Sequence, residues 1–144
     1  MHAVRKAESV YQSKMVTLKS KAEFDFVYKY GFRQHCKILS LYTIDIPHFK
    51  TENKVFTYKE RKALSLFSAV REDYLIGLSV SKKNGNAPQR NKIKRRLRAF
   101  CRNHQKDLQS HILLFVARDG ILDCTYSALE EEIWKMLNKR RKSV

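Results

Sequence analysis

The sequence predicts a single α/β domain, an α+β sandwich in which helices pack on one mixed β-sheet. Two observations support this prediction. The chain has 144 residues, of which 43% are hydrophobic and only four are Gly and two Pro, so it can bury one compact core. Apolar runs of strand length also alternate with apolar residues at helical spacing, and they predict the element order α-β-β-β-α-β-α.

The first predicted helix spans residues 21 to 30. Ser20 and Glu23 form a capping box at its start, in which each side chain accepts a hydrogen bond from an otherwise unpaired backbone NH. Gly31 ends the helix, because glycine tolerates the left-handed conformation of a helix C-cap. Residues 1 to 17 mix charged and polar side chains without a clear period, and we expect a flexible basic tail there.

Three strands are predicted between this helix and the next. Residues 38 to 46 are rich in β-branched and apolar side chains, and residues 32 to 37 form a short strand that leads into them. Residues 74 to 81 alternate between the two faces of a strand. The connection at 47 to 73 is long, polar and basic, and within it residues 63 to 70 predict an extra strand or the arm of a hairpin.

The second half of the chain predicts a helix, a strand and a final helix. Asn86 caps a helix that continues to about Leu108 and carries a narrow apolar stripe. Residues 111 to 118 are almost continuously apolar, which is typical of a central strand covered on both faces. A second capping box, formed by Ser127 and Glu130, opens the last helix.

The middle helix carries uncompensated positive charge. The chain has a formal net charge of +16, and ten Lys or Arg stand between Tyr74 and Lys106 without one Asp or Glu. A solvated helix face usually mixes acids with bases, because like charges four residues apart cost about 0.2 to 0.5 kcal/mol per pair. We therefore expect an anionic partner, and RNA is the polyanion that we predict.

Aromatic side chains give a second indication of single-stranded nucleic acid. Phe24 and Tyr28 lie one helical turn apart, and Tyr42 falls on a strand that is expected to pack nearby. Aromatic rings stack on bases while neighbouring cations neutralise the phosphates. Core packing is the more ordinary role for Phe24, and the residues alone leave both roles open.

The sequence contains no motif for catalysis by the polypeptide. It lacks paired carboxylates, a GxSxG motif and a phosphate-binding glycine loop, and residues 74 to 106 offer no acid to hold Mg²⁺. Its cysteines and histidines show no metal-binding spacing, so we expect no metal site in the protein. Because no apolar run has the length of a membrane span and no signal peptide is recognisable, we expect a cytoplasmic protein.

The run GLSVSKKNGNA from Gly77 to Ala87, followed by RNKIKRRLR from Arg90 to Arg98, resembles the central motif of the bacterial ribonuclease P protein component. The predicted elements from residue 18 to 140 also fall in the order of that family. The resemblance implies a left-handed β-α-β crossover around the basic helix, an exception to the usual handedness. It also implies a protein subunit that joins a catalytic RNA and precursor tRNA and assists the Mg²⁺-dependent, endonucleolytic removal of the 5′ leader.

The resemblance further implies a single RNA-binding domain over residues 18 to 144, with the catalytic centre and Mg²⁺ in the RNA subunit. No catalytic residue, membrane or obligate protein partner is expected for this chain. The positions that match the RNA-contacting motif of the family are Lys82, Lys83, Arg90, Asn91, Lys94, Arg95 and Arg98. The charge of the same helix adds Lys92, Arg96 and Arg102 to the predicted RNA-binding residues.

The resemblance also places the single-stranded leader in a cleft lined by Phe24, Tyr28 and Tyr42. Two departures from the family pattern stand out. Lys92 occupies a position that is usually Arg, and lysine lacks the planar fork for a bidentate contact. The connection at 47 to 73 is longer than usual for the family, and the sequence assigns it no role.

Two other functions stay open from the residues alone. A plain RNA-binding protein would explain the basic helix equally well, but not its combination with the aromatic helix. A DNA-binding regulator could use residues 86 to 108 as a recognition helix. That arrangement needs a preceding helix at a short turn, whereas a strand is predicted there.

Overall fold

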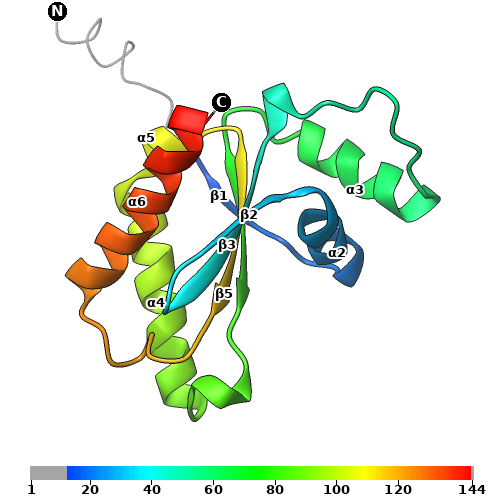
Figure 1. The fold of residues 1–144 in the computed structure, drawn as a ribbon. Helices are drawn as coiled ribbons and strands as arrows, with labels where there is room; N and C mark the ends of the chain where they lie inside the picture. The colour runs from blue at the N-terminus through cyan, green and yellow to red at the C-terminus, as the bar shows by residue number, and fades with distance from the viewer. Residues whose placement is uncertain (1–12, 144) are drawn as a thin grey trace, which may run out of the picture.

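The computed structural model describes residues 13 to 143, with side chains to residue 140. One five-stranded sheet lies between two layers of helices (Figure 1). The strands are β1 (Met15–Thr17), β2 (Phe32–His35), β3 (Leu39–Asp45), β4 (Tyr74–Ser79) and β5 (His111–Ala117). The helices are α2 (Lys21–Tyr30), α3 (Tyr58–Ser68), α4 (Ala87–Asn103), α5 (Gln105–Leu108) and α6 (Tyr126–Ser143). Short 3-10 turns follow β3 at Ile46–His48 and β4 at Lys82–Asn84.

The sheet is mixed, as predicted, with the strand order β1-β4-β5-β3-β2. β4 pairs in parallel with β1 and with β5, whereas β3 pairs antiparallel with β5 and with β2. α4 connects the adjacent parallel strands β4 and β5, which gives a β-α-β unit, and the left-handedness of its crossover stays a prediction. The turn at Lys82–Asn84 joins the basic helix to β4, and α5 joins it to β5.

Each face of the sheet carries its own core. α4 and α6 cover one face, where Leu97 and Ile133 pack with apolar residues of β3, β4 and β5. α2 and α3 cover the other face, where Phe26 and Phe67 pack over Ile112 and its neighbours. Figure 1 shows these two helix layers on opposite sides of the sheet. Residues 112 to 115 of β5 are buried under both layers, which confirms the prediction of a central strand.

The predicted boundary of the N-terminal tail is wrong. Residues 15 to 17 form β1, an edge strand whose Met15, Val16 and Thr17 pair in parallel with residues 74 to 76 of β4. A strand of three residues carries almost no local signal, because its conformation depends on hydrogen bonds to a partner distant in sequence. Residues 1 to 12, the rest of the predicted tail, lie outside the described residues.

The long connection at 47 to 73 contains a helix, and the prediction of a strand at 63 to 70 is wrong. Thr57 and Glu60 form a capping box at the start of α3, with Glu60 N 3.1 Å from Thr57 Oγ1 and Thr57 N 2.9 Å from Glu60 Oε1. Ala63 and Phe67, four residues apart, are both buried. The apolar pattern therefore has helical spacing, and residues 58 to 68 of the connection form a helix packed on the sheet.

Glu60 also joins α3 to α2, because its Oε2 lies 3.0 Å from Lys29 Nζ. The hydrogen bond from the Thr57 backbone and the bond from Lys29 lower the pKa of Glu60. A carboxyl with a lowered pKa stabilises the fold above its unfolded pKa, and this stabilisation is lost as the pH falls through the folded pKa. We therefore expect Glu60→Gln to lower the thermal unfolding temperature at neutral pH. Thermal unfolding of both proteins at neutral pH and at about pH 3 checks this, since the difference should shrink in acid. A difference independent of pH would contradict it.

Two helix boundaries differ from the predictions. The helix predicted to reach Leu108 breaks at His104, whose φ of −120° and ψ of 24° lie outside the helical region. The His104 ring stacks between Phe100 and Trp134, and its Nε2 lies 2.9 Å from Glu130 Oε2. These tertiary contacts accompany the turn between α4 and α5.

The last helix begins before the predicted capping box. Thr125 Oγ1 accepts a hydrogen bond from Ala128 N at 3.1 Å, and Thr125 O accepts one from Leu129 N. Glu130, the acid assigned to the box, bonds His104 instead. Thr125 is therefore the residue that caps α6, and a long-range contact takes the carboxylate that the local pattern assigned to the cap.

Candidate nucleic-acid interface

A rigid turn positions the start of the basic helix. Asn84 is buried, and its Nδ2 donates to Arg118 O at 3.3 Å. Gly85 has a φ of 122°, a backbone conformation that residues other than glycine rarely adopt. Asn86 and Gln89 then form a reciprocal capping box with bonds of 2.9 and 3.0 Å, which confirms Asn86 as the cap. Lys82 and Lys83 thereby project from an ordered turn.

The apolar stripe of α4 lies on the sheet, as predicted, with Ile93, Leu97, Phe100 and Cys101 buried. Desolvation raises the pKa of the Cys101 thiol to about 12, so this thiol is protonated at neutral pH. Packing of the stripe leaves the polar side of the helix facing outward. The exposed residues of the predicted RNA-binding set are Lys82, Lys83, Asn91, Lys92, Arg95 and Arg102, and Arg90, Lys94, Arg96 and Arg98 are half-buried.

These ten residues form a surface that we call the cationic ridge. Within the part of the chain that the structure describes, none of its nine cations forms an ion pair. Glu130 contacts the C-terminal end of α4, but its partner there is His104, which is not a ridge residue. The ridge charges are therefore not neutralised by carboxylates of residues 13 to 140. Carboxylates folded against the ridge would have removed the argument for an anionic partner.

Two ridge arginines differ from the others. Arg96 donates from a terminal guanidinium nitrogen to Cys124 O at 2.7 Å, which ties α4 to the loop before α6. Arg90 Nε is buried and has no hydrogen-bond partner within the described residues. Arg96 therefore has a structural contact that the helical pattern did not indicate.

The three predicted cleft aromatics lie on the opposite face of the sheet, beside α2, and we call them the aromatic strip. The rings of Tyr28 and Tyr42 meet edge to face, with centroids 5.0 Å apart and planes at 82°. Tyr28 is 39% exposed, whereas Phe24 is half-buried against the core. The structure thus joins Tyr28 and Tyr42 directly, and Phe24 packs at the base of the strip.

Gly77 lets α2 approach the sheet closely. A Cβ at this position of β4 would lie 2.7 Å from Leu18 Cδ1 and 3.0 Å from Phe24 Cε2. We expect Gly77→Ala to lower the free energy of unfolding by about 1 to 3 kcal/mol, because the added methyl overfills a packed contact. Urea unfolding of the purified chain measures this. A variant as stable as the parent would show that Leu18, Leu114 and Phe24 move aside freely.

Two polar residues that the sequence pattern did not single out lie next to the strip. Arg33 pairs with Tyr42, and His35 pairs with Ser40, in the antiparallel register of β2 and β3. Directly paired residues lie on the same face of a sheet, so Arg33 and His35 flank the strip, and both are exposed. The alternation of residues 32 to 35 was visible in the sequence, but the face on which Arg33 lies depends on the register.

The elements around α4 bear on the alternative function of a DNA-binding regulator. β4 and the turn at Lys82–Asn84 precede α4, so the helix pair of a DNA-binding regulator is not formed there. In the same part of the chain, no helix combines the length and hydropathy of a membrane span. The expectations of a cytoplasmic protein and of a chain without its own metal stay predictions.

Comparisons with known proteins agree with this geometry. The Ribonuclease P family model matches residues 13 to 141. The Ribonuclease P protein component of Helicobacter pylori strain HPAG1 is 39% identical over 140 residues, which cover 92% of this chain and 79% of that protein. The Ribonuclease P protein component of a Nitratiruptor species is 34% identical over 128 residues, covering 88% and 94%.

Solved structures show the same fold. The Staphylococcus aureus RNase P protein superposes with a TM-score of 0.65 at 25% identity, covering 88% of this chain and 96% of that one. The Thermotoga maritima RNase P protein gives a TM-score of 0.61 at 16% identity, covering 85% and 96%. The fold, the motif on α4 and the family match identify the chain as a member of the ribonuclease P protein family, the protein components of a tRNA-processing ribonuclease.

Proposed function

We propose that this chain binds the catalytic RNA of a ribonuclease P through the cationic ridge. The observation that carries this proposal is the absence of ion pairs along the ridge within the described residues. Arginine forks give bidentate contacts to phosphate, and lysines act as point charges. A helix whose cations are held in place by a buried stripe offers RNA phosphates a preorganised surface.

The aromatic strip is proposed to hold the single-stranded 5′ leader of precursor tRNA. Tyr28 and Tyr42 offer partly exposed aromatic surface for base stacking, and Arg33 supplies a cation beside Tyr42 for the leader phosphates. The strip and the ridge belong to opposite faces of one sheet. One small protein could then contact the catalytic RNA and the substrate together.

The reaction is proposed to be Mg²⁺-dependent endonucleolytic removal of the leader by the cytoplasmic ribonucleoprotein. The described residues contain no group of three or more His, Cys, Asp or Glu that could hold a metal ion. We therefore assign the catalytic centre and its Mg²⁺ to the RNA subunit. The chain contributes binding: it reduces phosphate repulsion between the two RNAs and retains the leader, which strengthens substrate and metal binding.

Reconstitution tests this function. The full chain is combined with RNA subunit transcribed from the source genome, and the release of 5′ leader from precursor tRNA is measured at low and high Mg²⁺. We expect no cleavage by the protein alone and stimulation of the RNA mainly at low Mg²⁺. Affinity for the RNA should fall by about 10³ to 10⁵ between ~50 and ~200 mM salt if about 6 to 10 phosphates are neutralised. Cleavage by RNA-free protein, or binding insensitive to salt, would contradict the proposal.

A further inference from the structure

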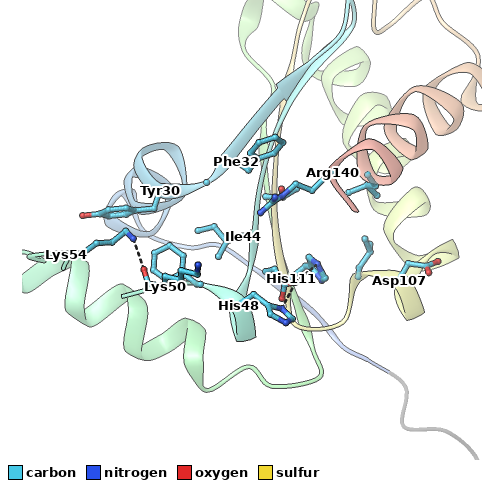
Figure 2. Close-up of a pocket in the computed structure, with 15 residues that line it drawn as sticks. Tyr30, Phe32, Ile44, His48, Lys50, Lys54, Asp107, His111 and Arg140 are labelled. Carbon is cyan, nitrogen blue, oxygen red and sulfur yellow. Dashed lines mark hydrogen bonds and ion pairs between the residues drawn. The ribbon is translucent and has the colours of Figure 1, made fainter. Parts of the chain in front are cut away.

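A pocket of about 550 Å³ lies at the end of β3, apart from the cationic ridge and the aromatic strip. Its lining comes from the junction of α2 and β2, from the end of β3, from the first residues of the 47 to 73 connection and from the end of α6. Asp107 and Leu108 of α5 and His111 at the start of β5 complete it. No residue of the ridge or the strip lines it. Figure 2 shows Tyr30 and Lys54 on one side of this pocket and Arg140 on the opposite side.

Aromatic rings and cations are paired in the pocket walls. Phe32, which is 40% exposed, carries the guanidinium carbon of Arg140 4.4 Å from its ring centroid. On the other side, Lys54 Nζ lies 5.6 Å from the ring centroid of Phe49. Lys50 adds a third cation to the lining. Flat apolar surfaces next to positive charges suit a ligand that has both a π-face and an anionic group.

The pocket also presents hydrogen-bond acceptors. Asp45 Oδ2 lies 2.9 Å from His48 Nδ1 and 3.8 Å from His111 Nε2. Within the described residues, Asp45 Oδ1 accepts no hydrogen bond. A bare phosphate would be repelled by this carboxylate, whereas an amino group of a ligand could donate to it. The occupant therefore carries donors as well as negative charge.

An unpaired buried hydroxyl lies in the same lining. Thr43 is 4% exposed, and its Oγ1 has no hydrogen-bond partner within the described residues. A buried polar group without a partner costs free energy, which a ligand would recover once rotation of the Thr43 side chain turns this hydroxyl into the pocket. Thr43 is the residue of β3 opposite Phe32, so this hydroxyl lies beside the aromatic wall.

We propose that this pocket binds a nucleoside monophosphate unit. Its base would stack on the pair of Phe32 and Arg140 and donate to Asp45, while its phosphate would bind Lys50 and Lys54 on the opposite side of the pocket. Phe49, Lys50 and Lys54 belong to the 47 to 73 connection, so the pocket gives that connection a binding role. This inference does not depend on the proposed function, because free nucleotide can be tested without any RNA subunit.

Titration of the full chain with adenosine monophosphate, followed by two-dimensional NMR, tests the proposal. Shifts are expected at Gly31, Thr43 and His48, with weaker binding of adenosine and of inorganic phosphate. Thr43→Val and Arg140→Gln should each weaken binding by about fivefold to about tenfold through one lost hydrogen bond or charge contact. Lys59→Gln, on α3 outside the pocket, is the control and should leave the affinity unchanged.

Thr43→Val removes an unpaired hydroxyl, so the thermal stability of this variant should be equal or higher, and weaker binding cannot then reflect misfolding. Displacement of the nucleotide by single-stranded oligoadenylate would assign the pocket to a nucleotide of RNA, and failure to displace it would assign a free nucleotide. Inorganic phosphate binding as tightly as the nucleotide, shifts confined to the ridge, or unchanged affinity in both pocket variants would overturn the proposal.

Discussion

Replacing Lys94, Arg95 and Arg98 with glutamine is expected to lower the affinity for the RNA subunit by about 10²-fold at ~0.15 M salt, because each lost phosphate contact reduces the slope of log K against log salt by about 0.9 in magnitude. Glutamine keeps the first two methylenes of these side chains, and the buried stripe is unchanged, so the packing of α4 on the sheet is retained. Removing the like charges at Lys94 and Arg98 also relieves repulsion within the helix. The folded state should therefore be as stable as that of the parent.

Filter binding to the transcribed RNA subunit over a range of salt concentrations measures this effect. The slope should fall by about 3 in magnitude for the ridge variant. The matched control is Lys59→Gln, Arg61→Gln, Lys62→Gln, which removes the same charge from exposed positions of α3. Equal losses in the two variants would show that net charge alone, and not the ridge, determines binding.

Replacing Tyr28 and Tyr42 with leucine is expected to weaken binding of precursor tRNA by between about 5-fold and about 150-fold, the loss of one stacked base. The two rings meet edge to face, with centroids 5.0 Å apart, so we treat them as one stacking site. The expected loss of affinity is therefore that of a single base stacked on this site. Leucine keeps apolar contact with the core but has no π-face for a base. Mature tRNA, which lacks the leader, should bind the parent and variant holoenzymes equally.

Affinity of the reconstituted holoenzyme for precursor and for mature tRNA, measured side by side, checks this expectation. Tyr58→Leu supplies a control, since Tyr58 is 72% exposed and lies on α3, outside the strip. A loss of the same size for mature tRNA would mean that the tyrosines contact the tRNA body or support the fold. Thermal unfolding of the double variant separates these two outcomes.

Local signals predicted much of the fold. The capping residues Ser20 and Asn86 and the apolar stripe from Ile93 to Phe100 locate α2 and α4, because each signal acts within a few residues of chain. The same kind of signal is present at Thr57 and Glu60, where the structure has a helix in place of the predicted strand. β1 could not be found in this way, since its three residues are held by pairing with β4.

The amino-acid sequence by itself determined the cationic ridge, because side chains at helical spacing on a capped helix share one side wherever that helix packs. It also determined which aromatic residues were available for the strip. Only the tertiary structure decided that Arg33 lies beside Tyr42, that Arg96 is drawn to Cys124, and that the end of α6 meets the 47 to 73 connection around one pocket. These arrangements depend on strand register and on contacts between residues far apart in the chain, and neither is encoded in a local pattern.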